Sequence, residues 1–143
     1  ISRAPRYDIA SKRNLKTVEK QFAMDNGLIL ACSTTNQISP SHALENLVYN
    51  ELKYRGYEVF LGKTYKGEID FVAMKGGKKC FIQVAYSLAD EAVAEREFSA
   101  YDSVRDQSPK YVMSLDTFDM SRNGVIHLNI EDWLMGKAEL FLS

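Results

Sequence analysis

The residues of this chain best suited to chemistry are acids that separate elements could bring together. Glu45 lies early in a predicted helix, and Asp70 lies in the middle of a strand, between Ile69 and Phe71. Glu68 precedes Asp70 by two residues, so both project from one face of that strand. A helix packed on the sheet could bring Glu45 near Asp70. Three acids, Asp70, Glu45 and Glu68, could therefore converge at one place.

The strand that follows Asp70 raises the question of how this acid is satisfied. A Lys-Gly-Gly-Lys turn leads into the apolar stretch KCFIQVAYS, where the sequence has Gln83 and Ala85 in place of charged partners. An unpaired buried carboxylate is strongly disfavoured and shifts its pKa. We therefore expect polar neighbours to satisfy Asp70, namely an amide hydrogen bond donated by Gln83 and contacts to Tyr49, Tyr86 or backbone amides.

The elements that must position these residues follow the order helix, three strands, helix, two strands. Apolar residues at helical spacing predict a first helix between an N-cap at Ser41 and a stop at Gly56. A second helix is expected over 88–107, before Pro109, and a short closing helix over 131–137. Strands are expected at 57–62, 67–74, 79–87, 110–116 and 124–130. The first three strands are joined by turns and so should be antiparallel, whereas the helix before the fourth allows it to pair in parallel with the third.

With Glu45, the segments KYRGYEVFLG, GEID and IQVA resemble the core of the PD-(D/E)XK nuclease superfamily, the restriction-endonuclease-like fold. The resemblance implies an α/β domain in which a helix acid, a strand Asp and a Glu-x-Lys on the next strand hold Mg²⁺ and activate water. By this correspondence Glu45 is the helix acid and Asp70 the strand Asp. Gln83 stands where the Glu would be, and Ala85 replaces the lysine.

These two departures predict a catalytically degenerate site made of Glu45, Asp70 and Gln83. A positioned proton-transfer or charge-stabilising group is typically worth ~100- to 10,000-fold in rate. Two compensations stay open: Glu68 as a substitute ligand, and Lys53 or Lys63 in place of the lost lysine. An active Mg²⁺-dependent DNA endonuclease is therefore the alternative, although we expect no cofactor in this chain.

A second resemblance covers nearly the whole chain. The segments RYDI, EKQFAMDNGL, HALENLVYNELKYRGYEVFLGK, EIDFVA, IQVAYSLAD, EREF and PKYVMSLD resemble the C-terminal domain that follows the AAA-type ATPase module in many prokaryotic ATP-binding proteins. This implies a winged-helix remnant or β-wing at 1–31 and a nuclease-like domain at 32–143. It also implies that the ATPase module is the partner and the place where ATP binds. The chain opens with Ile1 rather than Met, which agrees with a segment of a longer protein.

The N-terminal segment offers a second kind of function. Residues 1–25 carry a net charge of +3, although the whole chain carries -1. Arg6, Lys12, Arg13 and Lys16 on a wing could contact DNA phosphates. The same charges also suit a solvated hairpin surface or contacts to the ATPase module. A protein-interaction module with no role on DNA, including a homo-oligomer, is therefore a third hypothesis.

Composition excludes several other classes. At 143 residues, 45% of them hydrophobic, the chain can build one core. No run approaches the roughly 18 apolar residues of a membrane helix, so no membrane partner is expected. Cys32 and Cys80 fit no metal spacing, and reduced core thiols favour a cytoplasmic setting. His42 and His127 are isolated, which predicts structural roles.

The tripeptide GKT at 62–64 is similar to part of a phosphate-binding loop. That motif needs four residues between its glycines, a strand before it and a helix after it. Five residues separate Gly56 from Gly62, one more than the motif allows, and the residues after Thr64 are expected to continue as a strand. The chain therefore has no P-loop of its own.

Overall fold

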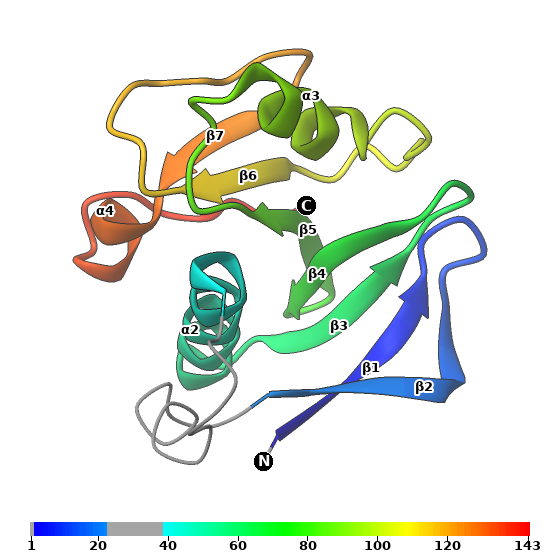
Figure 1. The fold of residues 1–143 in the computed structure, drawn as a ribbon. Coiled ribbons are helices and arrows are strands. Elements are labelled where there is room, and N and C mark those ends of the chain that lie inside the picture. Colours follow the sequence, from blue (N-terminus) through cyan, green and yellow to red (C-terminus); the bar gives the residue numbers. More distant parts are fainter. Residues whose placement is uncertain (1, 23–38) are drawn as a thin grey trace.

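The structure, a computed structural model, describes residues 2–22 and 39–143, and for 15–22 the backbone alone. The described part is a mixed α/β fold with a seven-stranded sheet and three helices (Figure 1). The strands are β1 Ser2–Asp8, β2 Arg13–Phe22, β3 Glu58–Lys63, β4 Glu68–Lys75, β5 Lys78–Val84, β6 Lys110–Ser114 and β7 Ile126–Asn129. The helices are α2 Pro40–Tyr54, α3 Glu91–Ser99 and α4 Ile130–Leu134. No helix in the described ranges is long and apolar enough to cross a membrane.

The sheet has the order β2-β1-β3-β4-β5-β6-β7. The three strands β3, β4 and β5 are antiparallel, as predicted, and β6 pairs in parallel with β5 across the segment that contains α3. Strand β7 extends the parallel part. Gly76 and Gly77, with φ of 60° and 77°, close the β4–β5 hairpin, a conformation that glycine adopts without strain.

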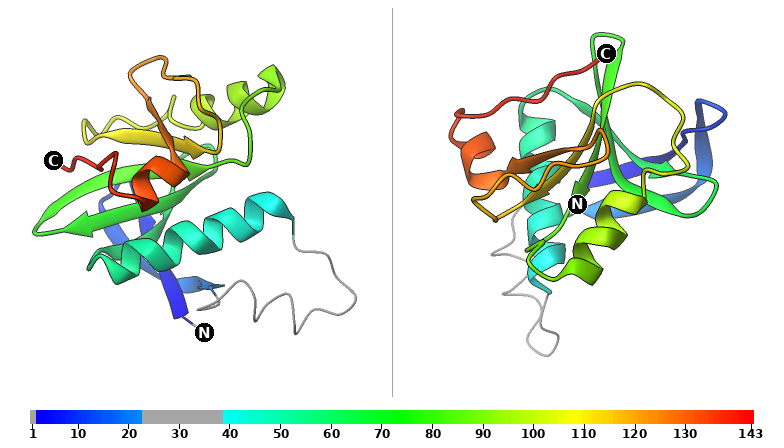
Figure 2. Two further views of the ribbon diagram at one scale, coloured as in Figure 1. Left: turned by 90° about the vertical axis from the view of Figure 1, so that its left-hand side faces the viewer. Right: turned by 90° about the horizontal axis from the view of Figure 1, so that it is seen from above.

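Two hydrophobic clusters lie on opposite faces of this sheet. Alternation along β4 sends Phe71 and Ala73 to one face and Val72 to the other. Helices α2 and α4 cover the first face, and α3 covers the second (Figures 1 and 2). Both faces of the sheet are thus covered.

The helix boundaries differ from the sequence-based expectation. Helix α2 begins at Pro40, and its N-cap is Ser39, whose hydroxyl accepts a hydrogen bond from His42 N at 3.2 Å. The second helix spans only Glu91–Ser99 instead of 88–107. It begins after Asp90, an N-cap in an extended conformation whose Oδ1 accepts from Ala92 N at 2.8 Å, and Leu88 N donates to Asp116 Oδ2 at 2.6 Å outside the helix.

The N-terminal segment forms a hairpin of β1 and β2, as expected for a wing. Strand β1 also pairs in parallel with β3, so this hairpin belongs to the same sheet as the rest of the fold. The predicted boundary between residues 31 and 32 lies outside the described residues. The division into a winged remnant and a nuclease-like domain therefore stays a prediction.

Candidate functional site

The candidate site lies where β4 and β5 separate. The two strands pair from Lys75 opposite Lys78 to Phe71 opposite Ile82, and no further. Beyond that point β5 continues along β6, and Ala85 N donates to Met113 O at 2.9 Å. Strand β4 meanwhile carries one extra residue relative to β3, because residues 70 and 71 together stand opposite 61. The bulge and the separation open the sheet at Asp70.

Two side chains complete the hydrogen bonding at this opening. Gln83 Oε1 accepts a hydrogen bond from Asp70 N at 2.7 Å, and Asp70 Oδ2 accepts one from Val84 N at 2.8 Å. The prediction that a backbone amide satisfies Asp70 is confirmed. The prediction that the Gln83 amide donates to the Asp70 carboxylate is wrong, because Gln83 Oε1 accepts from the peptide N–H of Asp70. Both side chains act as substitutes for backbone groups that the bulge leaves apart.

Three acids meet around a cavity of about 370 Å³ beside this opening. Asp70 comes from β4, Glu45 from the first half of α2 and Glu97 from α3. Arg96 also lines the cavity, and its Nη2 lies 3.3 Å from Glu97 Oε1. The expected approach of Glu45 to Asp70 is therefore found.

The surroundings of the cavity favour the protonated forms of its carboxyl groups. Burial raises the pKa of Asp70 well above its usual range, the charge and hydrogen bond of Glu45 raise it further, and the bond from Val84 N opposes this. Burial also raises the pKa of Glu97, against the influence of Arg96. Carboxyl groups this close cannot easily all ionise, so the cluster retains a proton to higher pH than isolated acids would. Such a cluster would favour a bound cation as well as a proton.

The remaining predicted ligand lies elsewhere. Glu68 Oε1 is paired with Arg6 Nη1 at 2.8 Å, and Glu68 does not line the cavity. Lys53 and Lys63 do not line it either. Within the described residues, no group of three His, Cys, Asp or Glu side chains has the arrangement of a metal site. The acids of the cavity would have to move in order to share an ion.

Glu97 is the acid of the site that the sequence analysis missed. It lies between Ala94 and Phe98, on the apolar side of α3, and is 8% exposed. An acid next to the buried stripe of an amphipathic helix was the available signal. Its distance from Asp70 could not be read from the sequence, because it depends on how α3 docks on the sheet.

Of the two histidines, His127 has structural surroundings. His127 Nδ1 accepts from Met120 N at 3.1 Å, so its proton is on Nε2, which lies 2.7 Å from Ser114 Oγ. Ser114 in turn donates to Asp116 Oδ2 at 2.8 Å. Burial lowers the pKa of His127, with Asp116 opposing this. Because Ser114 is fully buried and donates to a carboxylate, it is no nucleophile, and the geometry supports a structural role for His127. At the other histidine, His42 Nδ1 lies 3.4 Å from Glu45 Oε2 at the start of α2.

The basic residues predicted to contact nucleic acid, and the two cysteines, differ in their surroundings. Lys12 in the β1–β2 turn and Arg13 at the start of β2 are exposed, whereas Arg6 forms an ion pair with Glu68. The side chain of Lys16, and Cys32, lie outside the described residues. Burial raises the pKa of Cys80 to about 12, which makes this thiol unreactive.

Comparison with known proteins finds one informative relative. An uncharacterized protein of Haemophilus influenzae is 31% identical to the chain over 134 residues. The match covers 93% of this chain and 33% of the Haemophilus protein, so the chain spans about a third of that relative's length. No family model matches the chain, and no solved structure matches it. Functional conclusions must therefore come from the site itself.

Proposed function

We propose that the chain is a catalytically degenerate, restriction-endonuclease-like accessory domain of an AAA-type ATPase, with a role in nucleic-acid binding, assembly or regulation. The observation that carries this proposal is the state of Gln83 and Ala85. The Gln83 carbonyl oxygen is occupied by Asp70 N at 2.7 Å, and Ala85 is 3% exposed and packed with the cluster under α3. Neither residue presents a carboxylate or an ammonium group to the acidic cavity.

Two further observations support the family assignment within this proposal. The order of α2, β3, β4, β5, α3 and β6, with Glu45 beside Asp70 at an opening of the sheet, is the arrangement that the resemblance implies. The match also leaves most of the Haemophilus protein outside it, which gives room for an ATPase module. ATP would then bind in that module, since Lys63 and Thr64 of this chain lead into a hairpin turn and not into a helix.

A second candidate function is an active metal-dependent nuclease, and Glu97 is the observation that favours it. Glu97 supplies a third acid to the cavity of Glu45 and Asp70, and Arg96 supplies a cation at the same place. A divalent ion there would replace the retained proton, because a metal-bound carboxylate must be ionised. In that case Glu97 would act instead of Gln83, and Arg96 instead of the missing lysine.

Calorimetric titration of Mn²⁺ into the chain separates these two candidates. Under the degenerate proposal we expect no binding tighter than about 1 mM, which corresponds to roughly 4 kcal/mol, and no Mg²⁺-dependent cleavage of duplex, branched or single-stranded DNA. Micromolar binding that is lost in Asp70→Asn and Glu97→Gln, together with cleavage, would establish the active nuclease instead. Glu68→Gln is the matched control, since Glu68 pairs with Arg6 outside the cavity.

The nucleic-acid role has its own test. DNA affinity measured against salt concentration should fall steeply, and Lys12→Ala and Arg13→Ala should each reduce the slope by about one. Lys137→Ala, an exposed lysine in the turn after α4, should leave the slope unchanged. Absence of salt-dependent binding would remove the nucleic-acid role and leave assembly with protein partners.

A further inference from the structure

A second, larger cavity lies at another corner of the fold. It has a volume of about 640 Å³ and is formed by the β1–β2 turn, the β3–β4 turn and the segment that follows α3. Figure 1 shows these three connections close together at one edge of the molecule. None of its lining residues belongs to the acidic cavity. The volume is in the range of about 300 to 1,000 Å³ that small-ligand sites occupy.

Closed turns hold the side chains that rim this cavity. Thr64 N donates to Gly67 O at 2.8 Å, and Gly67 N donates to Thr64 Oγ1 at 2.9 Å, so Tyr65 and Lys66 form the tip of a tight hairpin. On the neighbouring turn Asp8 Oδ1 accepts from Ala10 N at 3.1 Å. Lys12 follows with a positive φ of 56°. Each turn thereby presents a lysine to the same cavity.

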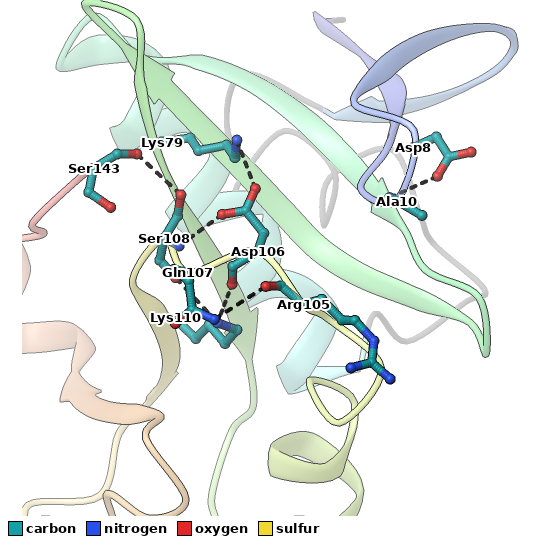
Figure 3. A network of polar contacts seen from close by, with 9 residues as sticks. All are labelled: Asp8, Ala10, Lys79, Arg105, Asp106, Gln107, Ser108, Lys110 and Ser143. Carbon is teal, nitrogen blue, oxygen red and sulfur yellow. Dashed lines mark hydrogen bonds and ion pairs between the residues drawn. The ribbon is translucent and has the colours of Figure 1, made fainter.

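In the segment that follows α3, the charge of Asp106 is already balanced by a lysine. Asp106 Oδ2 lies 2.9 Å from Lys79 Nζ, and its carboxylate accepts from Ser108 N at 2.8 Å (Figure 3). Although burial opposes this, the bonds from Lys79 and Ser108 lower the pKa of Asp106 to about 2. Lys110 Nζ donates to Asp106 O at 2.6 Å and anchors the same loop.

Apart from Asp106, the charged side chains that line the cavity are mostly basic, and one aromatic ring lies beside them. Figure 3 shows the Arg105 guanidinium extending away from the Asp106 network. Lys12, Lys66 and Arg105 line the cavity together with a single further acid, Asp102. Tyr65 is 93% exposed at the rim.

We propose that this cavity binds a nucleotide unit. The lysines Lys12 and Lys66 and the fork of Arg105 hold the phosphate, and the ring of Tyr65 stacks on the base. The same chemistry could be offered by a free nucleotide or by one residue of a single strand. For a strand, the inference rests on the nucleic-acid binding proposed above and names its site. For a free nucleotide, it stands alone.

The test measures binding of AMP and of a labelled short oligothymidylate to the full chain. Tyr65→Ala should weaken binding by roughly 5- to 100-fold, the range found when a stacking aromatic ring is removed. Arg105→Ala should weaken binding and lower the salt slope by about one. The matched controls are Tyr54→Ala, a tyrosine 87% exposed at the end of α2, and Lys137→Ala, and neither should change affinity.

The outcomes distinguish the two sources and the two proposals. AMP binding that depends on Tyr65 identifies a free nucleotide, and oligonucleotide binding without AMP binding identifies a strand. If neither ligand binds at millimolar concentration, or if Tyr65→Ala and Arg105→Ala behave like the controls, the inference is overturned. Oligonucleotide binding that falls only with Arg13→Ala would overturn it while leaving the general nucleic-acid role intact.

Discussion

Asp70→Asn should raise the midpoint of thermal unfolding at neutral and alkaline pH. Asparagine keeps an oxygen that can accept from Val84 N and gains an amide that can donate to Glu45, while it removes a negative charge from a buried cluster of acids. Burial and the charge of Glu45 both oppose ionisation of Asp70. Removing the ionisable group therefore relieves a cost that the folded wild type bears.

The pH dependence of this effect has a definite sign. The pKa of Asp70 in the folded chain lies above its unfolded value, which is about 3.9. Between these two values the folded state binds more protons, so wild-type stability falls as pH rises. The advantage of Asp70→Asn should accordingly be absent below about pH 4 and grow until the pH passes the folded-state pKa.

Asp70→Ala is the matched comparison, because it removes the acceptor as well as the charge. Val84 N would lose its partner at the sheet opening, which typically costs ~1–3 kcal/mol. Thermal melts of wild type, Asn and Ala variants between about pH 4 and 8 measure both effects. Equal destabilisation by both substitutions at the alkaline end would show that the Asp70 carboxylate is ionised and stabilising, contrary to this account.

The result also bears on function. If Asp70→Asn stabilises the chain, the wild type bears a folding cost for this acid, and the Mn²⁺ titration decides whether the acid still serves a binding site. If it destabilises the chain, the ionised carboxylate of Asp70 serves the fold. The stability measurement is thus independent of any metal or DNA assay and can be set beside them.

Trp133→Ala should be the most destabilising single substitution outside the acidic cavity. Trp133 is 1% exposed and belongs to the cluster between α2, α4 and the sheet. The guanidinium of Arg55 lies 4.5 Å from its ring centroid, and Arg55 Nη2 donates to Trp133 O at 2.8 Å. Removing a buried tryptophan ring typically costs about 3 to 5 kcal/mol, a large part of the roughly 5 to 15 kcal/mol that stabilises a domain.

Denaturant unfolding of the Trp133 variants measures this cost. Trp133→Phe should lose clearly less, because an aromatic ring remains to fill the space and to face Arg55. Met135→Ala, just past the end of the same helix and 70% exposed, should stay within about 0.5 kcal/mol of wild type. A loss below about 1 kcal/mol for Trp133→Ala would mean that α4 is not an integral part of the core.

The strands were predictable because their signals are local. The Lys-Gly-Gly-Lys turn between two apolar stretches indicated the β4–β5 hairpin, and the helical pattern between β5 and β6 allowed their parallel pairing. The second helix was predicted too long. Its start was a local signal as well, because Asp90 is a typical N-cap residue and its side chain accepts from Ala92 N.

The sequence by itself determined the order of elements, and its resemblance to the nuclease core predicted that Glu45 approaches Asp70. Only the tertiary structure decided that Glu97 joins them, that Glu68 pairs with Arg6 instead, and that Gln83 accepts from a peptide group. The reason is that a bulge in β4, the separation of β4 from β5 and the docking of α3 set these distances. Each of them is a contact between segments distant along the chain, and residue spacing carries no information about such contacts.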